Sequence, residues 1–121
     1  ETPPIFVPSV GNFAQGMIVQ IPLHLGTIAG APSLDDLHRA LSHHYAGSEF
    51  VKVLPMDDSQ ARIDAEALNN TNMLHLEVRG NADKGQAVLI AVLDNLGKGA
   101  SGAAVQNLNL MMGVESTTGL V

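Results

Sequence analysis

The chain lacks cysteine and tryptophan altogether and has few aromatic residues of any kind. Without cysteine it has no disulfide, no thiolate metal site and no thiol nucleophile. Aromatic residues make up only 3% of its 121 residues, so the core must be built from aliphatic side chains and methionine. Platforms for stacking nucleic-acid bases are therefore not expected.

Lysine and arginine are also scarce, six in all against twelve acidic residues, which gives a formal net charge of -6. They are scattered singly, so the sequence offers no basic patch for nucleic acid or an anionic membrane. Apolar runs fall short of the roughly 20 residues that a membrane span requires, and no signal peptide is recognisable. We expect a cytoplasmic protein with neither nucleic acid nor membrane among its partners.

What the chain does have is a hydrophobic content of 45%, enough for a core of its own. At this length a single domain buries about two-thirds of the surface that its unfolded form exposes. No internal repeat or linker divides the sequence, so residues 1–121 are predicted to form one domain. The chain starts with Glu1 rather than methionine, which suggests a piece of a longer polypeptide.

Four apolar segments predict the strands of an α+β domain. From Met17 to Leu25 the apolar residues occupy the odd positions, which indicates a one-sided strand, and Pro22 within it favours an edge or a bulge. Phe50 to Leu54 is a short strand, and Met73 to Arg79 alternates with its apolar side chains inward. Gln86 to Leu93 is apolar on both faces, which predicts a central strand antiparallel to its predecessor.

Two helices are predicted between and after these strands. Ser33 followed by Asp36 resembles a capping box and begins the first helix, which Gly47 ends. The second helix follows Leu93 through a glycine-spaced turn and ends at Gly113. A further turn of helix is expected near residues 65–68.

The glycine-spaced turn after Leu93 is the strongest candidate for a binding site. Gly97, Gly99 and Gly102 let the backbone approach a bound group closely, and the first helical turn offers unpaired N–H groups to anionic or carbonyl oxygens. Asn95 and Lys98 add polar side chains. A phosphate, an oxyanion or a nicotinamide amide would each suit this chemistry, and the spacing alone does not choose among them.

Other motifs give weaker evidence of a functional site. The five histidines lie on three different elements without a metal-binding spacing, so no metal site is predicted. Ser101 lacks the surroundings of a nucleophile elbow, and the GKGAS segment lacks the spacing of a P-loop. Asn95 could be a turn-former or a ligand contact, because its side-chain amide both donates and accepts. The glycine-containing loop from Ser9 to Gly16 is similarly either an ordinary surface loop or a functional one.

Three stretches together resemble a known family. In order they are FVPSVGNFAQGMIVQIPLHL, HHYAGSEFVKV and GQAVLIAVLDNLGKGASGAAVQNLNLMMG. From about Ile5 to Gly113 the chain resembles the C-terminal domain of N-acetyl-gamma-glutamyl-phosphate reductase, in its shorter variant. The most specific part is the string from Asp94 to Asn107.

The resemblance implies a fold and an activity. The fold is that of glyceraldehyde-phosphate-dehydrogenase-like C-terminal domains, a mixed and largely antiparallel sheet with helices on one face and dimer contacts on the other. The family reduces N-acetyl-glutamyl phosphate to N-acetylglutamate semialdehyde in arginine biosynthesis, with NADPH, a catalytic cysteine and a histidine. Neither catalytic residue nor the N-terminal Rossmann domain is present here. The chain alone is therefore expected to be inactive and to bind no NADP(H) tightly, while associating as a homodimer, or as a tetramer in the parent enzyme.

By the same resemblance, the cofactor side of the site would comprise Asn95, Gly97, Lys98 and Gly99. The substrate side would comprise Ser9, Asn12 and Gln15 in the first loop. Many family members have an arginine near Gly16, where this chain has Ala14 and Gln15, so Lys98 would be the nearer cation. No catalytic residue and no metal ligand is expected within the chain.

Two alternatives remain open from the sequence. One is a stand-alone, non-catalytic binding or assembly module of the same fold. The other is a fragment of an aspartate-semialdehyde dehydrogenase, against which the VGNFAQG loop and the short C-terminus argue.

Overall fold

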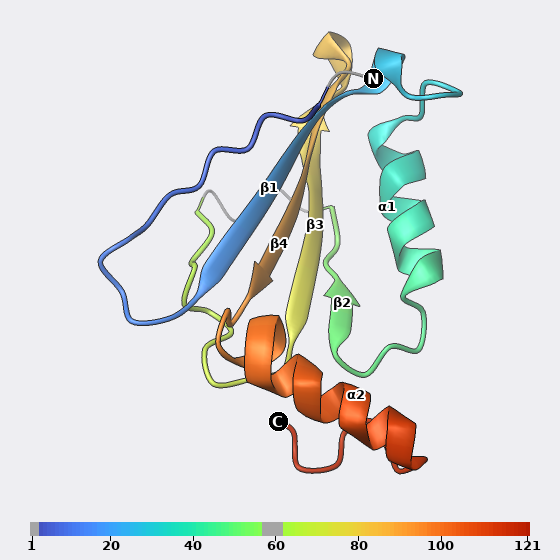
Figure 1. The fold of residues 1–121 in the computed structure, drawn as a ribbon. Helices are drawn as coiled ribbons and strands as arrows, with labels where there is room; N and C mark the ends of the chain where they lie inside the picture. The colour runs from blue at the N-terminus through green and yellow to red at the C-terminus, as the bar shows by residue number, and fades with distance from the viewer. Residues whose placement is uncertain (1–2, 57–61) are drawn as a thin grey trace.

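The computed structural model describes residues 3–56 and 62–121, which form a four-stranded mixed sheet with two α-helices (Figure 1). The α+β prediction is therefore confirmed. The strands are β1 (Met17–His24), β2 (Val51–Val53), β3 (Leu74–Asn81) and β4 (Gln86–Leu93), in the spatial order β1-β4-β3-β2. The helices are α1 (Leu34–His44) and α2 (Gly102–Met112).

The apolar strand β4 occupies the inside of the sheet, as its two apolar faces predict. It pairs antiparallel with β3 on one side and with β1 on the other. β1 is an edge strand, which explains how Pro22 is accommodated, since an edge strand has one side without ladder bonds. The short strand β2 runs parallel to β3 and makes the sheet mixed.

One face of the sheet is apolar throughout, but α1 covers only part of it. A side chain built on Gly80 of β3 would lie 2.7 Å from Cδ2 of Leu34, which places α1 on this face, beside β2 and β3 (Figure 1). Val78 of β3, under the helix, is buried. The part of the same face formed by β1 has no such cover: Met17, Val19 and Ile21 are 39%, 41% and 51% exposed. We call these three residues the β1 surface.

The opposite face carries the main core. Leu68, Ile90 and Val92 are buried together there, with Ile18 and Met73 packed against them. An irregular segment before β3, rather than a helix, thus supplies the second layer on this face. The expected helix packing on one face is confirmed for α1. Dimer contacts through the other face stay a prediction, while the exposed apolar β1 surface lies on the α1 side.

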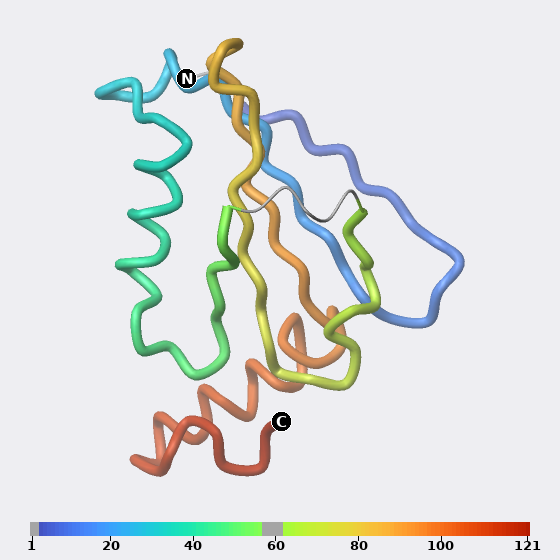
Figure 2. Tube along the Cα trace, turned by 180° about the vertical axis from the view of Figure 1, so that it is seen from behind, coloured from blue at the N-terminus to red at the C-terminus, as the bar shows by residue number. Residues whose placement is uncertain are grey.

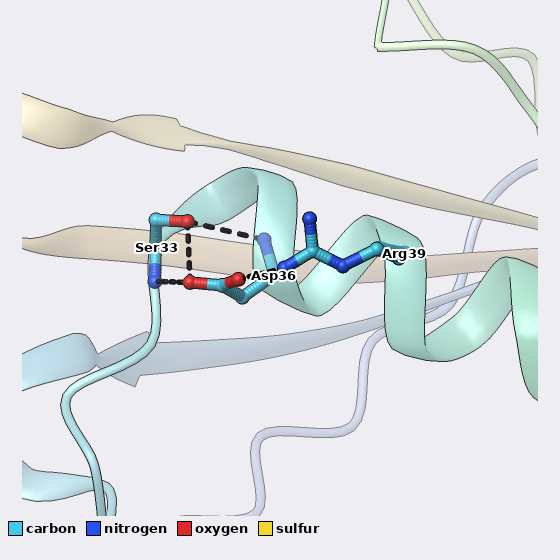
Figure 3. A network of polar contacts seen from close by, with 3 residues as sticks. All are labelled: Ser33, Asp36 and Arg39. Carbon is cyan, nitrogen blue, oxygen red and sulfur yellow. Dashed lines mark hydrogen bonds and ion pairs between the residues drawn. The ribbon is translucent and has the colours of Figure 1, made fainter.

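Helix α1 begins as the sequence predicts. The hydroxyl of Ser33 accepts from the N–H of Asp36 at 3.1 Å, and the Asp36 carboxylate accepts from the N–H of Ser33 at 2.9 Å, a complete capping box (Figure 3). Arg39 forms an ion pair with the same carboxylate. The helix ends at His44 rather than at Gly47, which adopts a left-handed φ of 81° in the turn that follows.

The chain does not pass from β4 directly into an α-helix. A short π-helical turn, η3 (Gly97–Ser101), comes first, and α2 then runs to Met112 with Gly113 as its left-handed C-cap at φ 69°. Figures 1 and 2 both show α2 lying across the end of the sheet. Neither described helix is long and apolar enough to cross a membrane.

The segment before β3 differs from its prediction. Residues 65–70 form consecutive hydrogen-bonded turns, in which the N–H of Asn69 donates to the carbonyl of Glu66 at 3.0 Å, instead of a helical turn. Residues 57–61 of the same stretch lie outside the described part of the chain.

Candidate functional site

Three segments distant in sequence meet where β4 ends. They are the loop before β1, the turn at residues 69–72 and the π-helical turn η3. The junction is built around Asp94, which directly follows β4 and is 2% exposed. A site was expected here from the sequence, but Asp94 was not among its expected residues.

The Asp94 carboxylate joins all three segments by hydrogen bonds. Its Oδ2 accepts from Nε2 of Gln15 at 3.0 Å and from the N–H of Asn70 at 2.7 Å. Its Oδ1 accepts from the N–H of Leu96 at 2.8 Å, and the N–H of Gly97 also bonds to the carboxylate. The carboxylate therefore serves as an internal anion at the start of the helical segment.

This arrangement corrects one prediction. The N–H groups at the start of the helix were expected to be unpaired and free to bind a ligand. Instead the carboxylate of Asp94 takes two of them, and its backbone carbonyl accepts from the N–H of Gly99 at 2.9 Å. The N–H of Ser101 donates to the carbonyl of Leu96 at 3.0 Å.

The environment of Asp94 keeps it ionised. Burial acts to raise the pKa of its carboxyl, but the backbone N–H groups of Asn70, Leu96 and Gly97 outweigh burial and leave the pKa below its ordinary value. A fixed negative charge therefore lies at the junction at neutral pH. A ligand phosphate close to it would be repelled unless a cation intervened.

Asn95 also holds the first loop, through a hydrogen bond to Gly16. Its Oδ1 accepts from the N–H of Gly16 at 2.7 Å, while Nδ2 of Asn69 donates to the carbonyl of Gln15 at 3.2 Å. Gly16 has a φ of 114°, a backbone conformation in which other residues are strained. The loop that the sequence predicts to face substrate is thus held by side chains of the junction.

Two glycines of the junction are required by close packing. A side chain built on Gly97 would lie 2.6 Å from the carbonyl oxygen of Thr71, and one on Gly102 would lie 2.3 Å from Oδ1 of Asn72. Gly99 differs, since its nearest neighbours would be at an ordinary 3.4 Å. Gly97 and Gly102 therefore allow close packing within the domain, where a side chain would overlap its neighbours.

The side chain of Lys98 contacts α2 and lies near Phe50. Its Nζ donates to Oε1 of Gln106 in α2 at 2.7 Å and lies 5.6 Å from the centre of the Phe50 ring. Partial burial lowers the pKa of its ammonium group. The same Gln106 oxygen accepts from Nδ2 of Asn72 at 3.2 Å. Lys98 is thus committed to packing α2 in this structure.

A hollow of about 360 Å³ lies over the junction. Of the residues expected at the site, Gln15, Gly97 and Gly102 line the hollow. They are joined by Asp94, Asn70 and Asn72, for which no role was expected. Ser9 and Asn12 are exposed in the loop and do not line the hollow, and neither do Asn95, Lys98 and Gly99. The polar run Asn69–Asn72, between the buried Leu68 and strand β3, was the signal that could have indicated Asn70 and Asn72.

The hollow has the character of a hydrogen-bonding site with one negative charge and no lining cation among the described residues. Its polar groups are mainly side-chain amides and the Asp94 carboxylate, and no lysine or arginine lines it among the described residues. Asn72 is 2% exposed and its Oδ1 has no hydrogen-bond partner. No group of three or more potential metal ligands occurs in residues 3–56 and 62–121.

Comparison with known families identifies the sheet that supports this junction. A family model described as "Semialdehyde dehydrogenase, dimerisation domain" matches residues 1–95, all four strands and α1 included. This chain belongs to that family. The match ends at Asn95, before η3 and α2.

Several relatives of this dimerisation domain are proteins named N-acetyl-gamma-glutamyl-phosphate reductase. Those of Brucella ovis, Brucella canis and Brucella abortus strain S19 are each 56% identical over 112 residues. The match covers 91% of this chain but only 36% of each relative. The chain therefore spans about a third of the length of the relatives that it matches.

Proposed function

We propose that this chain is the dimerisation and substrate-binding part of an NADPH-dependent reductase in the cytoplasm. The reductase would convert N-acetyl-glutamyl 5-phosphate to N-acetylglutamate 5-semialdehyde in arginine biosynthesis. The main support is the 56% identity to proteins named for that activity, together with the family match over residues 1–95. The Rossmann domain, the catalytic cysteine and the catalytic histidine would belong to the remainder of the longer chain.

The proposed contribution of the sheet is to hold two subunits together. The β1 surface exposes three neighbouring apolar side chains on a rigid strand, within the region that matches the dimerisation family. Exposed apolar patches of this kind are typical of protein–protein interfaces. A homodimer, or a tetramer built from such dimers, would bury the β1 surface.

The proposed contribution of the junction is to complete the pocket for cofactor and substrate. A nicotinamide carboxamide suits it better than a phosphate, because Asp94 supplies a negative charge and the amides of Gln15, Asn70 and Asn72 can exchange hydrogen bonds with another amide. Asn95, Gly97, Lys98 and Gly99 stay predicted on the cofactor side.

Ser9, Asn12 and Gln15 stay predicted on the substrate side. Ser9 and Asn12 are exposed and so available to a substrate, whereas Gln15 is bonded to Asp94. The cation for the acyl phosphate would come from outside the hollow, because Lys98 is bonded to Gln106.

The test is a chimera in which this chain replaces the matching region of the Brucella ovis reductase. We expect the chimera to reduce N-acetyl-glutamyl phosphate with NADPH, and the isolated chain to do so at no measurable rate and to bind NADPH weakly or not at all. A well-folded chimera without activity would contradict the proposal. Turnover by the isolated chain would contradict the assignment of the catalytic groups to the rest of the protein.

A further inference from the structure

The side-chain amide of Gln15 is held in one orientation at the junction. Its Nε2 donates to Oδ2 of Asp94 and to Oδ1 of Asn70, both at 3.0 Å. Backbone N–H groups keep the Asp94 carboxylate ionised, so this carboxylate can accept hydrogen bonds but not donate them. Turning the Gln15 amide over would set its oxygen against the anion. The nitrogen therefore faces Asp94, and the oxygen does not.

The oxygen of the same amide is available to a ligand. None of the described residues donates a hydrogen bond to Oε1 of Gln15. In the described part of the chain, the buried side-chain atoms without a partner are Oδ1 of Asn69 and Oδ1 of Asn72, so the oxygen of the half-buried Gln15 is accessible. Gln15 also lines the hollow of about 360 Å³. The hollow thus has an oriented acceptor beside its fixed negative charge.

The charge beside this acceptor restricts the ligand that it can bind. Asp94 and Oε1 of Gln15 both repel anionic oxygens, and no lysine or arginine among the described residues lines the hollow. The carboxylate and phosphate of N-acetyl-glutamyl phosphate are therefore disfavoured next to Gln15. A ligand N–H is favoured, because it can donate to Oε1. That substrate has a single N–H, which belongs to its acetamido group.

We propose that Oε1 of Gln15 accepts a hydrogen bond from the acetamido N–H of the substrate, which makes Gln15 a specificity-determining residue for the N-acyl group. This inference rests on the proposed function, in which Gln15 is on the substrate side. Asp94 acts through Gln15, as the positioning residue that fixes the orientation of its amide. Asn70 and Asn72 remain for the carboxamide of the cofactor.

The experiment compares two substrates in the chimera with the Brucella ovis reductase. They are N-acetyl-glutamyl phosphate and its 2-acetoxy analogue, in which an ester oxygen replaces the N–H. We expect kcat/KM to be at least about tenfold higher for the amide, because the ester oxygen would meet Oε1 without a proton between them. Gln15→Met should reduce this preference to less than about threefold, since a thioether is only a weak acceptor. Ala14→Met, the matched control, places methionine at the exposed neighbouring position and should keep the preference.

The ratio of the two kcat/KM values separates recognition from folding. Loss of the bond from Gln15 to Asp94 would disturb the junction and lower kcat/KM for both substrates alike, whereas loss of the proposed bond lowers it for the amide alone. The 3-acetylpyridine analogue of NADPH, which lacks the carboxamide NH2, tests the cofactor as an alternative donor. Gln15→Met should leave the preference for NADPH over this analogue unchanged.

Hydrogen exchange of side-chain amides tests the orientation of Gln15 without turnover. In the isolated chain, the Nε2 protons of Gln15 should exchange at least about tenfold more slowly than those of Gln20, because hydrogen-bonded protons exchange only when the structure opens locally. Gln20 is the matched control, since it is an exposed glutamine of strand β1.

Four results would overturn the inference. They are equal use of both substrates by the wild-type chimera, a preference for the amide that survives Gln15→Met, loss of the preference for NADPH in that variant, and equal exchange of Gln15 and Gln20. A folded chimera that reduces neither acyl phosphate contradicts the proposed function, and the inference with it. An active chimera that gives any of the four results contradicts the inference alone.

Discussion

At the scale of single residues, Asp94 determines the geometry of the junction. Its carboxylate accepts hydrogen bonds from Gln15, which is 79 residues away in sequence, and from Asn70, which is 24 residues away. It also bonds to the first N–H groups of the helical segment. One buried anion thus couples the position of the first loop to that of the turn before α2.

The substitution Asp94→Asn tests this role. The amide can accept at only one of its two polar atoms, so it leaves at least one buried N–H group without a partner. We expect the free energy of unfolding to fall by about 2 kcal/mol, measured by urea denaturation. Asp83→Asn, at an exposed aspartate, is the matched control and should change it by less than about 0.5 kcal/mol. Equal stability of the two variants would contradict the account.

The same residue predicts a dependence on pH. The pKa of the Asp94 carboxyl is lower in the folded chain than its ordinary value of 3.8, so the unfolded chain binds the proton first as the pH falls. Its contribution is complete above about pH 5 and is lost as the pH drops below about 4, through the folded-state pKa. The stability difference between wild type and Asp94→Asn should therefore shrink in that range. The pKa of Asp36 is also lowered, but Asp36 is present in both proteins, so its contribution cancels in the stability difference. A difference that stays constant down to about pH 3 would be inconsistent with this prediction.

The sequence was enough to locate this junction, but not to predict the hydrogen bonds that hold it together. Asn95, Gly97 and Gly99 were recognisable because strand, asparagine and glycines follow one another locally. The partners of Asp94 were not, because no local pattern reveals that Gln15 and Asn70 fold against the end of β4. The bond of Lys98 to Gln106 was hidden for the same reason, and its place on the cofactor side stays a prediction.

At the scale of elements, the π-helical turn η3 brings α2 against the turn at Asn72. Gly102, the first residue of α2, allows this approach because a side chain there would overlap Oδ1 of Asn72 at 2.3 Å. Patterns of apolar residues predicted the strands and both helices well, including β4 at the inside of the sheet. They did not predict the π-helical turn or the parallel pairing of β2, since neither leaves a local signal in so short a segment.

Alanine substitutions at two glycines test the close approach of α2. In a helix, alanine is more stable than glycine at the same position by up to about 1 kcal/mol. We expect Gly99→Ala to be neutral or stabilising, because its new methyl group meets only ordinary contacts at 3.4 Å. Gly102→Ala should instead destabilise the domain by about 1–3 kcal/mol, because Asn72 must move. Urea unfolding of both variants measures the contrast, and similar stabilities would refute the packing argument.

At the scale of the whole molecule, this domain presents two separate apolar surfaces. The β1 surface lies within the region that matches the dimerisation family, and exposed apolar residues of α2, among them Met111 and Met112, lie beyond it. The chain spans 36% of the length of its reductase relatives. We propose the β1 surface as the subunit contact, because it lies inside the region that matches the dimerisation family.

The most direct measurement of the central claim is sedimentation equilibrium of the isolated chain and of its Val19→Lys variant. The account predicts a dimer for the wild type and a monomer for Val19→Lys, because a lysine in the middle of the β1 surface would be buried without a partner. Val10→Lys, the same change at a residue that is 101% exposed outside the sheet, should remain a dimer, and circular dichroism should show all three proteins folded. A monomeric wild type at high concentration, or a Val19→Lys variant that dimerises as strongly as the wild type, would contradict dimerisation through β1.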